Sequence, residues 1–311
     1  MQEPRLDSVT CASPAGLHRM AYWEWGDPDN DRVLLCVHGL TRTGRDFDTL
    51  ARQLAPHFRV VCPDVVGRGA SDWLANPAYY TIPQYVSDMT ALIARLRPAA
   101  LDWVGTSMGG LIGLALSGAL AMARALRASG GYTGTHAESL GNGPGIRLNR
   151  MVLNDVGPRL DLPALRRIGE YVGQPGEHAS FAQAVRAMRE NSETFGPHTD
   201  EQWEALARYV FRRQGERWVK HYDLGLAKPL AAQTPDVYAA GEQILWQAWD
   251  ALDCPALVLR GARSDLLSAE TAAEMCRRNP RARVVEIPGV GHAPTLMTPQ
   301  QIEPVAQFLL G

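Results

Sequence analysis

The segment that most constrains this chain is Gly105-Thr106-Ser107-Met108-Gly109-Gly110. The apolar run Leu101–Val104 before it is typical of a short buried strand, and the Ala- and Leu-rich stretch Leu111–Leu126 after it is typical of a helix. Ser107 is therefore expected at a sharp strand-to-helix turn, where a side chain at either flanking glycine would clash with its neighbours. The N-terminus of the helix would favour negative charge developing near the hydroxyl. The sequence thus predicts a nucleophilic serine.

The rest of the chain alternates buried apolar runs with helical patterns. Runs expected as strands covered on both faces lie at Val33–Val37, Val60–Cys62, Met151–Leu153, Ala256–Arg260 and Arg283–Ile287. Two looser strands are expected at 6–12 and 17–25, and amphipathic helices after Thr81 and near 269–278 and 299–310. This alternation predicts an α/β fold with a doubly wound, mostly parallel sheet.

Residues 158–250 lack a buried β-run and carry successive helical patterns instead. Thr199-Asp200-Glu201-Gln202 has the form of a capping box, and one helical face follows it: Trp203, Leu206, Ala207, Val210 and Phe211. We therefore expect a helical cap at 158–250, inserted into a core made of 1–157 and 251–311. The stretch 128–147 is Gly-rich, polar and unperiodic, and is expected as a loop insertion within the core.

Charge and composition narrow the classes of partner. The chain has 31 Lys and Arg against 33 Asp and Glu, a net charge of −2, with its arginines scattered, which argues against a nucleic-acid partner. The N-terminus lacks the apolar region of a signal peptide, and no apolar stretch of membrane-spanning length is expected. Five widely spaced cysteines show no metal-binding spacing. We expect a cytoplasmic protein without a metal, cofactor or membrane partner, and the oligomeric state stays open.

Three motifs in chain order carry a resemblance to a known family. They are His38-Gly39-Leu40-Thr41-Arg42, Gly105-Thr106-Ser107-Met108-Gly109, and the late pair Asp265 and His292. Through them the chain resembles, over nearly its full length, the α/β-hydrolases of the capped, esterase-like kind. The resemblance implies an acid after the penultimate core strand and a histidine after the last. Asp265 follows the run at 256–260 and His292 follows the run at 283–287.

The resemblance implies a role for each of these residues. Ser107 is the nucleophile, His292 takes its proton, and Asp265 holds the imidazole in the required tautomer. The backbone N–H of Met108, by motif, and that of Leu40, by family analogy, form the oxyanion hole, with His38 supporting the loop. Asp155 is a competing acid, because it ends the preceding core strand and related enzymes sometimes use that position.

These residues predict a serine hydrolase that cleaves a small carboxylic ester or lactone through an acyl-enzyme. Ser107 argues against dehalogenases and epoxide hydrolases, which need a carboxylate at this position. A C–C hydrolase of ring-cleavage products stays open, although Leu40-Thr41-Arg42-Thr43-Gly44 departs from the Gly- and Pro-rich segment of those enzymes. A non-catalytic ligand-binding module of the same fold is the second alternative.

Other side chains have two interpretations each. Arg42 and Arg45 follow the oxyanion loop, where they can meet a substrate carboxylate or form surface ion pairs. Several side chains of the expected cap can line a pocket or only pack: Trp203, Trp218, His221 and Trp246.

Overall fold

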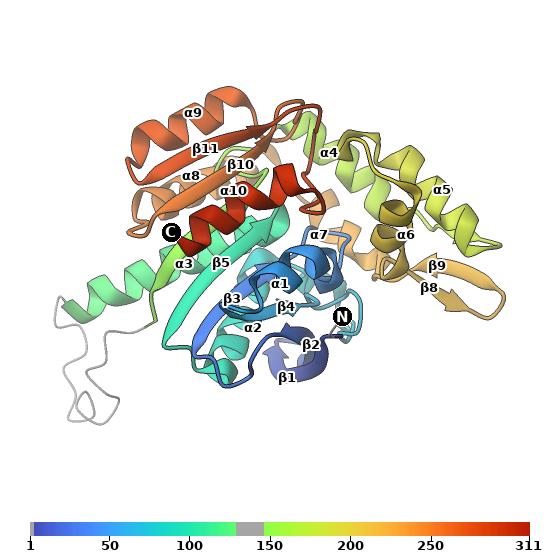
Figure 1. Cartoon of the computed structure of the whole chain (residues 1–311), viewed down its shortest axis with the longest axis horizontal. Helices are drawn as coiled ribbons and strands as arrows, with labels where there is room; N and C mark the ends of the chain where they lie inside the picture. Colours follow the sequence, from blue (N-terminus) through green and yellow to red (C-terminus); the bar gives the residue numbers. More distant parts are fainter. Residues whose placement is uncertain (1–2, 129–145) are drawn as a thin grey trace.

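The structure, a computed structural model, describes residues 3–128 and 146–311, so the expected loop insertion at 128–147 falls almost wholly outside the described residues. The chain forms an eight-stranded sheet in the order β1-β2-β4-β3-β5-β6-β10-β11 (Figure 1). The strands are β1 (Arg5–Ser13), β2 (Gly16–Trp25), β3 (Arg32–Val37), β4 (Arg59–Pro63), β5 (Ala100–Thr106), β6 (Leu148–Asn154), β10 (Ala256–Gly261) and β11 (Ala282–Ile287). Only the β1–β2 and β2–β4 pairs are antiparallel. The prediction of a mostly parallel, doubly wound sheet is confirmed.

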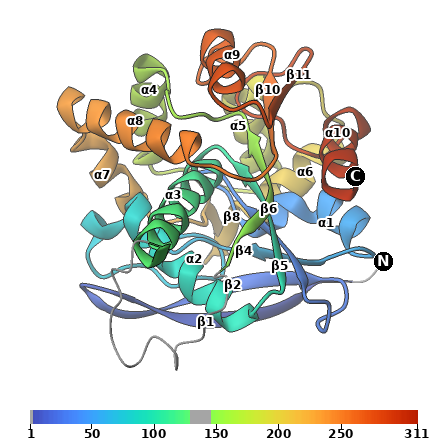
Figure 2. The same cartoon turned by 90° about the vertical axis from the view of Figure 1, so that its left-hand side faces the viewer.

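Helices cover both faces of this sheet (Figures 1 and 2). One face packs against α2 (Ile82–Leu96), α3 (Met108–Ala128), α8 (Pro235–Asp250) and α9 (Ala269–Arg278), and the other against α1 (Asp48–Leu54) and α10 (Pro299–Leu310). Side chains alternate between the two faces along a strand, so Leu35 joins the first hydrophobic cluster and Leu34 the second. Both are fully buried, which explains why the central strands are continuously apolar.

The helix after the serine, α3, is long and apolar enough to span a membrane, with a mean hydropathy of 1.5 over Met108–Arg127. The expectation that the chain holds no such stretch is therefore wrong on length and composition. Ile112, Leu114 and Leu116 on this helix are buried in the core, whereas Met122 is exposed. A single helix of this kind is weak evidence for a membrane span, because the core helices of globular domains share its length and composition.

The segment between β6 and β10 carries α4 (Leu162–Val172), α5 (Phe181–Asn191), α6 (Asp200–Arg208), α7 (Ala227–Ala231) and α8. Thr199 and Gln202 form the predicted capping box of α6, which is confirmed. The predicted apolar face is buried in a separate cluster that also contains Ala184 and Met188 of α5. However, α6 ends at Arg208, and Phe211 begins a strand instead of continuing the helix.

That strand belongs to a small sheet, which the expectation of helices alone had missed. β7 (Glu177–His178), β9 (Arg217–Lys220) and β8 (Phe211–Gln214) pair in that order, all antiparallel. Gly215, at φ 59°, supplies the left-handed residue of the tight turn between β8 and β9. The β8 side chains after Phe211 are exposed, so the hairpin has no buried apolar run that would reveal it in the sequence.

The last helix of the expected cap segment, α8, packs on the core helix α3. A Cβ atom added to Gly118 of α3 would lie 2.8 Å from the Cβ of Ala248 in α8, so the two helices approach closely at a glycine. Trp249 of α8 is fully buried and donates its indole N–H to the main-chain oxygen of Met275 in α9 at 3.0 Å. This end of 158–250 is therefore part of the layer that covers the sheet.

Candidate active site

Ser107 lies at the turn between β5 and α3, with a left-handed φ of 51°. Its backbone N–H donates to the oxygen of Asn154 at the end of β6, at 2.9 Å. A Cβ added to Gly105 would overlap the backbone of Gly109, and one added to Gly109 would lie 2.5 Å from the carbonyl carbon of Val37 in β3. The prediction that both glycines are sterically required is confirmed, and the turn holds a non-glycine residue in a strained conformation.

A chain of hydrogen bonds joins this serine to a histidine and a carboxylate. Nε2 of His292, in the loop after β11, lies 2.9 Å from the Ser107 hydroxyl oxygen. Nδ1 of the same ring lies 2.8 Å from Oδ2 of Asp155. Because a carboxylate only accepts, Nδ1–H donates to Asp155 and Nε2 is left to accept the serine proton. Asp155 is fully buried and the His292 side chain is 15% exposed, so the serine end of the chain faces the more accessible side.

The carboxylate hydrogen-bonded to His292 is that of Asp155, and not that of Asp265 as the sequence analysis expected. The Asp265 side chain is 42% exposed and forms an ion pair with Arg167 of α4 at 2.5 Å. Sheet order does not decide between the two carboxylates, because β6 and β10 both lie between β5 and β11, the strands that precede the serine and the histidine. The loop after β10 makes the difference, because it turns Asp265 outward and leaves Asp155 beside the imidazole.

The residue before Asp265 points inward instead. The Ser264 hydroxyl donates to Oδ2 of Asp155 at 2.6 Å, and the N–H of Gly261 donates to Oδ1 at 2.8 Å. Asp155 also has a positive φ of 57°, held by its own N–H to the oxygen of Leu259 at 2.7 Å. These bonds fix a buried carboxylate toward the imidazole, and sequence analysis had not singled out Ser264.

Asn154 is a second residue that the sequence analysis missed. Its Nδ2 donates to Oγ1 of Thr106, beside the serine, at 3.0 Å, and to the oxygen of Pro294, in the histidine loop, at 2.8 Å. One buried amide therefore ties the serine turn to the loop that carries His292. Its position at a strand end next to Asp155 was the available sequence signal.

The loop expected to form the oxyanion hole adjoins the serine. A Cβ added to Gly39 would lie 3.8 Å from the Cβ of Ser107. His38 braces this loop: its Nδ1–H donates to the oxygen of Gly39 at 2.7 Å, and its Nε2 accepts the N–H of Val65 at 2.9 Å. Burial lowers the pKa of His38 to about 3, so the ring is neutral.

The two predicted oxyanion donors flank this junction. Met108 is the first residue of α3, and N–H groups in the first turn of a helix have no partner within the helix. Leu40 directly follows Gly39, and its main-chain oxygen accepts a bond from Nε of Arg68 at 2.8 Å. That Leu40 and Met108 bind an oxyanion stays a prediction.

The cap contacts the histidine loop directly. The N–H of Gly291 donates to the oxygen of Thr194 at 2.6 Å, and the Thr194 hydroxyl donates to the oxygen of His292 at 3.0 Å. A further bond joins Nε2 of His198 and Oγ1 of Thr295 at 2.8 Å. The linker between α5 and α6 thus holds both ends of the segment that carries the catalytic imidazole candidate.

The other candidate side chains have local partners. Arg42 pairs with Asp46 at 2.6 Å and Arg45 with Asp48 at 2.7 Å, which favours ion pairs over a free substrate-binding role. Trp203 stacks on Phe195 within the hydrophobic cluster of α5 and α6, called the cap cluster below, and Trp218 packs against Phe181. Nδ1 of His221 bonds the main-chain oxygen of Tyr209, and the Arg278 guanidinium lies over the Trp246 ring. These contacts fit packing roles.

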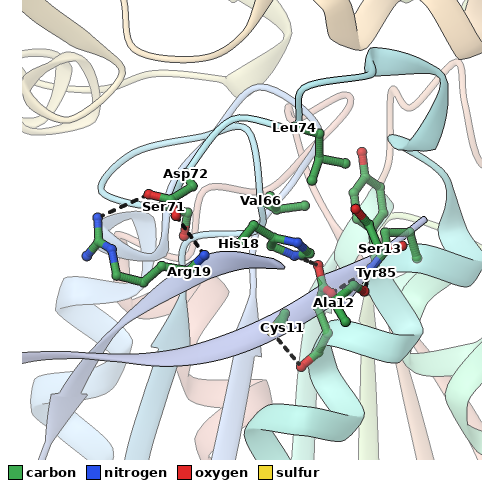
Figure 3. Close-up of polar contacts among 12 residues, drawn as sticks. Cys11, Ala12, Ser13, His18, Arg19, Val66, Ser71, Asp72, Leu74 and Tyr85 are labelled. Carbon is green, nitrogen blue, oxygen red and sulfur yellow. Dashed lines mark hydrogen bonds and ion pairs between the residues drawn. The ribbon is translucent and has the colours of Figure 1, made fainter. Parts of the chain in front are cut away.

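Among the described residues, one group of side chains brings three potential metal ligands together: Cys11, His18 and Asp88, all buried. Cys11 and His18 of this group are labelled in Figure 3. Hydrogen bonds join these side chains, and Nδ1 of His18 is buried with no hydrogen-bond partner among the described residues. Nε2 of His18 lies 3.1 Å from Oδ2 of Asp88, Nε2 of Gln84 donates to Oδ1 at 2.8 Å, and the Cys11 thiol points to the main-chain oxygen of Asp88 at 3.9 Å. It is a polar network between the β1–β2 hairpin and α2.

A serine, a histidine and a buried carboxylate, hydrogen-bonded in a row beyond the ends of β5, β11 and β6, form the arrangement that is typical of α/β-hydrolases. The sequence profile described as Alpha/beta hydrolase family matches residues 34–307. The chain belongs to the alpha/beta hydrolase family.

Several proteins similar to this chain indicate which kind of alpha/beta hydrolase it resembles. The chain is 49% identical, over 99% of its length and 98% of the other, to a 3-hydroxybutyrate-oligomer hydrolase of Cupriavidus necator. It is 28% identical to an esterase of Mycobacterium tuberculosis, over 85% of this chain and 76% of that protein. A crystal structure of an alpha/beta hydrolase from Novosphingobium aromaticivorans has a TM-score of 0.80 and 35% identity, covering 100% of this chain and 99% of that chain. The predicted resemblance, fold and ester-hydrolase class are confirmed by these matches.

Proposed function

We propose that this chain is a serine esterase that hydrolyses short linear oligomers of 3-hydroxybutyrate through an acyl-enzyme. The observation that carries the proposal is the hydrogen-bonded chain from Ser107 through His292 to Asp155. The choice of substrate is supported by the 49% identity with the oligomer hydrolase, which extends over both chains almost completely. Ester bonds link such oligomers, so their cleavage is a carboxylic ester hydrolysis.

In the first half of the reaction, Ser107 attacks the ester carbonyl carbon while its proton moves to Nε2 of His292. Asp155, hydrogen-bonded to Nδ1–H, stabilises the imidazolium and keeps the productive tautomer. The N–H groups of Met108 and Leu40 bind the tetrahedral oxyanion. When the intermediate collapses, the C–O bond to the alcohol part breaks, and the imidazolium gives its proton to the departing hydroxyl group.

In the second half, water takes the place of the alcohol. His292 accepts a proton from water as the water oxygen attacks the acyl-Ser107 carbonyl, and the oxyanion forms at the same two N–H groups. Collapse releases the acid and returns the proton to the Ser107 oxygen. Each turnover therefore consumes one water and yields one carboxylic acid and one alcohol, with the triad restored.

The alternatives differ in what they require of this site. A small lactone would use the same steps and stays the first alternative substrate class. A C–C hydrolase is disfavoured by the Leu40–Gly44 segment, which lacks the Gly- and Pro-rich pattern of those enzymes. A non-catalytic binding module has no need for a serine, imidazole and buried carboxylate in hydrogen-bonding register. The cytoplasmic location and the lack of nucleic-acid and membrane partners stay predictions.

The proposal is tested by incubating the purified protein with the 3-hydroxybutyrate dimer and trimer, short p-nitrophenyl esters, butyrolactones and a dienoate ring-cleavage product. We expect the dimer and trimer to be cleaved with the highest kcat/KM, with 3-hydroxybutyrate measured by chromatography. Ser107→Ala should abolish turnover while retaining the wild-type circular dichroism spectrum. Turnover of the oligomers by that variant, or preference for the dienoate, would contradict the proposal.

A further inference from the structure

Arg68 is a fully buried cation whose charge is not offset by a carboxylate. Nε donates to the oxygen of Leu40 at 2.8 Å, and Nη1 donates to the oxygen of Val66 at 2.6 Å and to the hydroxyl of Tyr85 at 3.0 Å. Nη2 faces the sulfur of Met108 at 3.3 Å. All four partners are neutral, and within residues 3–128 and 146–311 no acidic side chain forms an ion pair with this guanidinium.

Such an arrangement is costly, because hydrogen bonds to neutral acceptors and the rings of Tyr80 and Tyr85 offset only part of a full charge in a low-dielectric interior. Two other buried arginines have carboxylate partners: Arg45 pairs with Asp48 at 2.7 Å, and Arg260 with Glu286 at 2.7 Å. Arg68 therefore differs from them in charge balance and not in burial.

The position of this charge is informative. Its contacts include both residues expected to supply the oxyanion hole, the main chain of Leu40 and the side chain of Met108. Arg68 also reaches from the turn after β4 to Tyr85 of α2, so its side chain joins the oxyanion loop to that helix. The same positive charge contributes, after burial, to the low pKa of His38 at the base of the loop.

We propose that Arg68 is the positioning residue of the oxyanion hole: it fixes the Leu40 loop beside Met108 and places a permanent positive charge behind the two N–H donors. This inference rests on the proposed serine esterase function. Negative charge forms on the substrate carbonyl oxygen only in the transition state, so the field of Arg68 acts there and not on the neutral ester. Removing the charge should therefore lower kcat with little change in KM.

Three substitutions of Arg68 separate the effect of its charge on catalysis from the effects of its volume and its N–H donors. Arg68→Met fills the space without charge or donors, Arg68→Gln restores N–H donors without charge, and Arg68→Lys restores charge. Arg45→Met is the matched control, because it removes a buried arginine that Asp48 balances. The substrates are the 3-hydroxybutyrate dimer and its methyl ester, which share the scissile ester but differ by one carboxylate. Circular dichroism and thermal unfolding establish which variants are folded.

We expect Arg68→Met and Arg68→Gln to lower kcat by roughly a hundredfold on both substrates, the typical effect of losing one oxyanion contact, with KM within about threefold. Arg68→Lys should recover a large part of that loss, and Arg45→Met should keep kcat within about threefold of wild type. Affinity for a boronic acid, whose Ser107 adduct is a tetrahedral anion, should fall in parallel with kcat in the uncharged variants.

Two results would overturn the inference. Wild-type kcat in folded Arg68→Gln would show that the charge does not act on the reaction. A loss confined to the dimer and absent for its methyl ester would make Arg68 a receptor for the substrate carboxylate instead. Failure of the proposed function itself has a different signature, namely oligomer cleavage that survives Ser107→Ala.

Discussion

Gly109→Ala is the substitution whose effect can be worked out most fully from this structure. The added methyl carbon would overlap the carbonyl oxygen of Val37 and lie 2.5 Å from its carbonyl carbon. These are backbone atoms of a central strand, so no side chain can rotate away, and β3 and the start of α3 would have to separate. Overpacking of this kind costs about 1–3 kcal/mol or more. The higher helix propensity of alanine stabilises the fold by only about 1 kcal/mol relative to glycine.

We therefore expect Gly109→Ala to lower the free energy of unfolding by about 2 kcal/mol or more and to displace the Ser107 turn, reducing esterase activity. Gly241→Ala is the control, because Gly241 is a helical glycine of α8 with no atom within 4 Å of an added Cβ. There the helix propensity acts alone, and the free energy of unfolding should rise by about 0.5–1 kcal/mol.

Urea unfolding of the wild type and the two variants, followed by circular dichroism and tryptophan fluorescence, measures both changes in the free energy of unfolding. The opposite signs follow from one structural difference, the strand packed against Gly109 and the open space beside Gly241. A Gly109→Ala variant as stable as the wild type would refute the close approach of α3 to β3, and with it the geometry of the serine turn.

Two further predictions concern pH and the cap. Between pH 7 and pH 5 His38 should cost about 2 kcal/mol of stability, because burial lowers its pKa from 6.5 to about 3 and only the unfolded chain takes up the proton there. Asp64, whose pKa burial raises to about 6, should offset about 1 kcal/mol of this loss, because the folded protein takes up its proton before the unfolded chain does. His38→Gln should therefore lose about 2 kcal/mol less stability than the wild type between pH 7 and pH 5, as measured by urea unfolding at the two pH values. Equal pH dependence in both proteins would contradict this. Trp203→Ala should destabilise by about 3–5 kcal/mol, because the ring is 3% exposed in the cap cluster, without changing the preference for acyl chain length in a panel of p-nitrophenyl esters; a changed preference with full stability would place the ring in the pocket instead.

The serine turn was predictable because its determinants are local. Two glycines, an apolar run and a helical pattern adjoin Ser107 in the sequence, and steric exclusion acts between these same residues. The capping box of α6 was predictable for the same reason, since it needs only Thr199 and Gln202. The β8–β9 hairpin was not, because its strands carry exposed polar side chains and gain their pairing from each other.

The acid could not be chosen from the sequence, because Asp155 and Asp265 follow neighbouring parallel strands that end at the same edge of the sheet. The choice depends on the loop after β10, where Ser264 turns inward to Asp155 and Asp265 turns outward to Arg167. Arg68 was overlooked for a similar reason: its four partners come from separate segments, and only tertiary structure brings them together.

The most direct test of the account compares Asp155→Asn with Asp265→Asn in steady-state hydrolysis of a short ester by folded protein. An asparagine at the acid position cannot hold the imidazole in the required tautomer, and in other serine hydrolases the corresponding change lowers kcat by about 10⁴-fold. We expect a loss of that order for Asp155→Asn and a kcat within about threefold of wild type for Asp265→Asn, whose side chain is exposed. The reverse order would show that His292 is held by Asp265 during catalysis and would contradict the assigned triad.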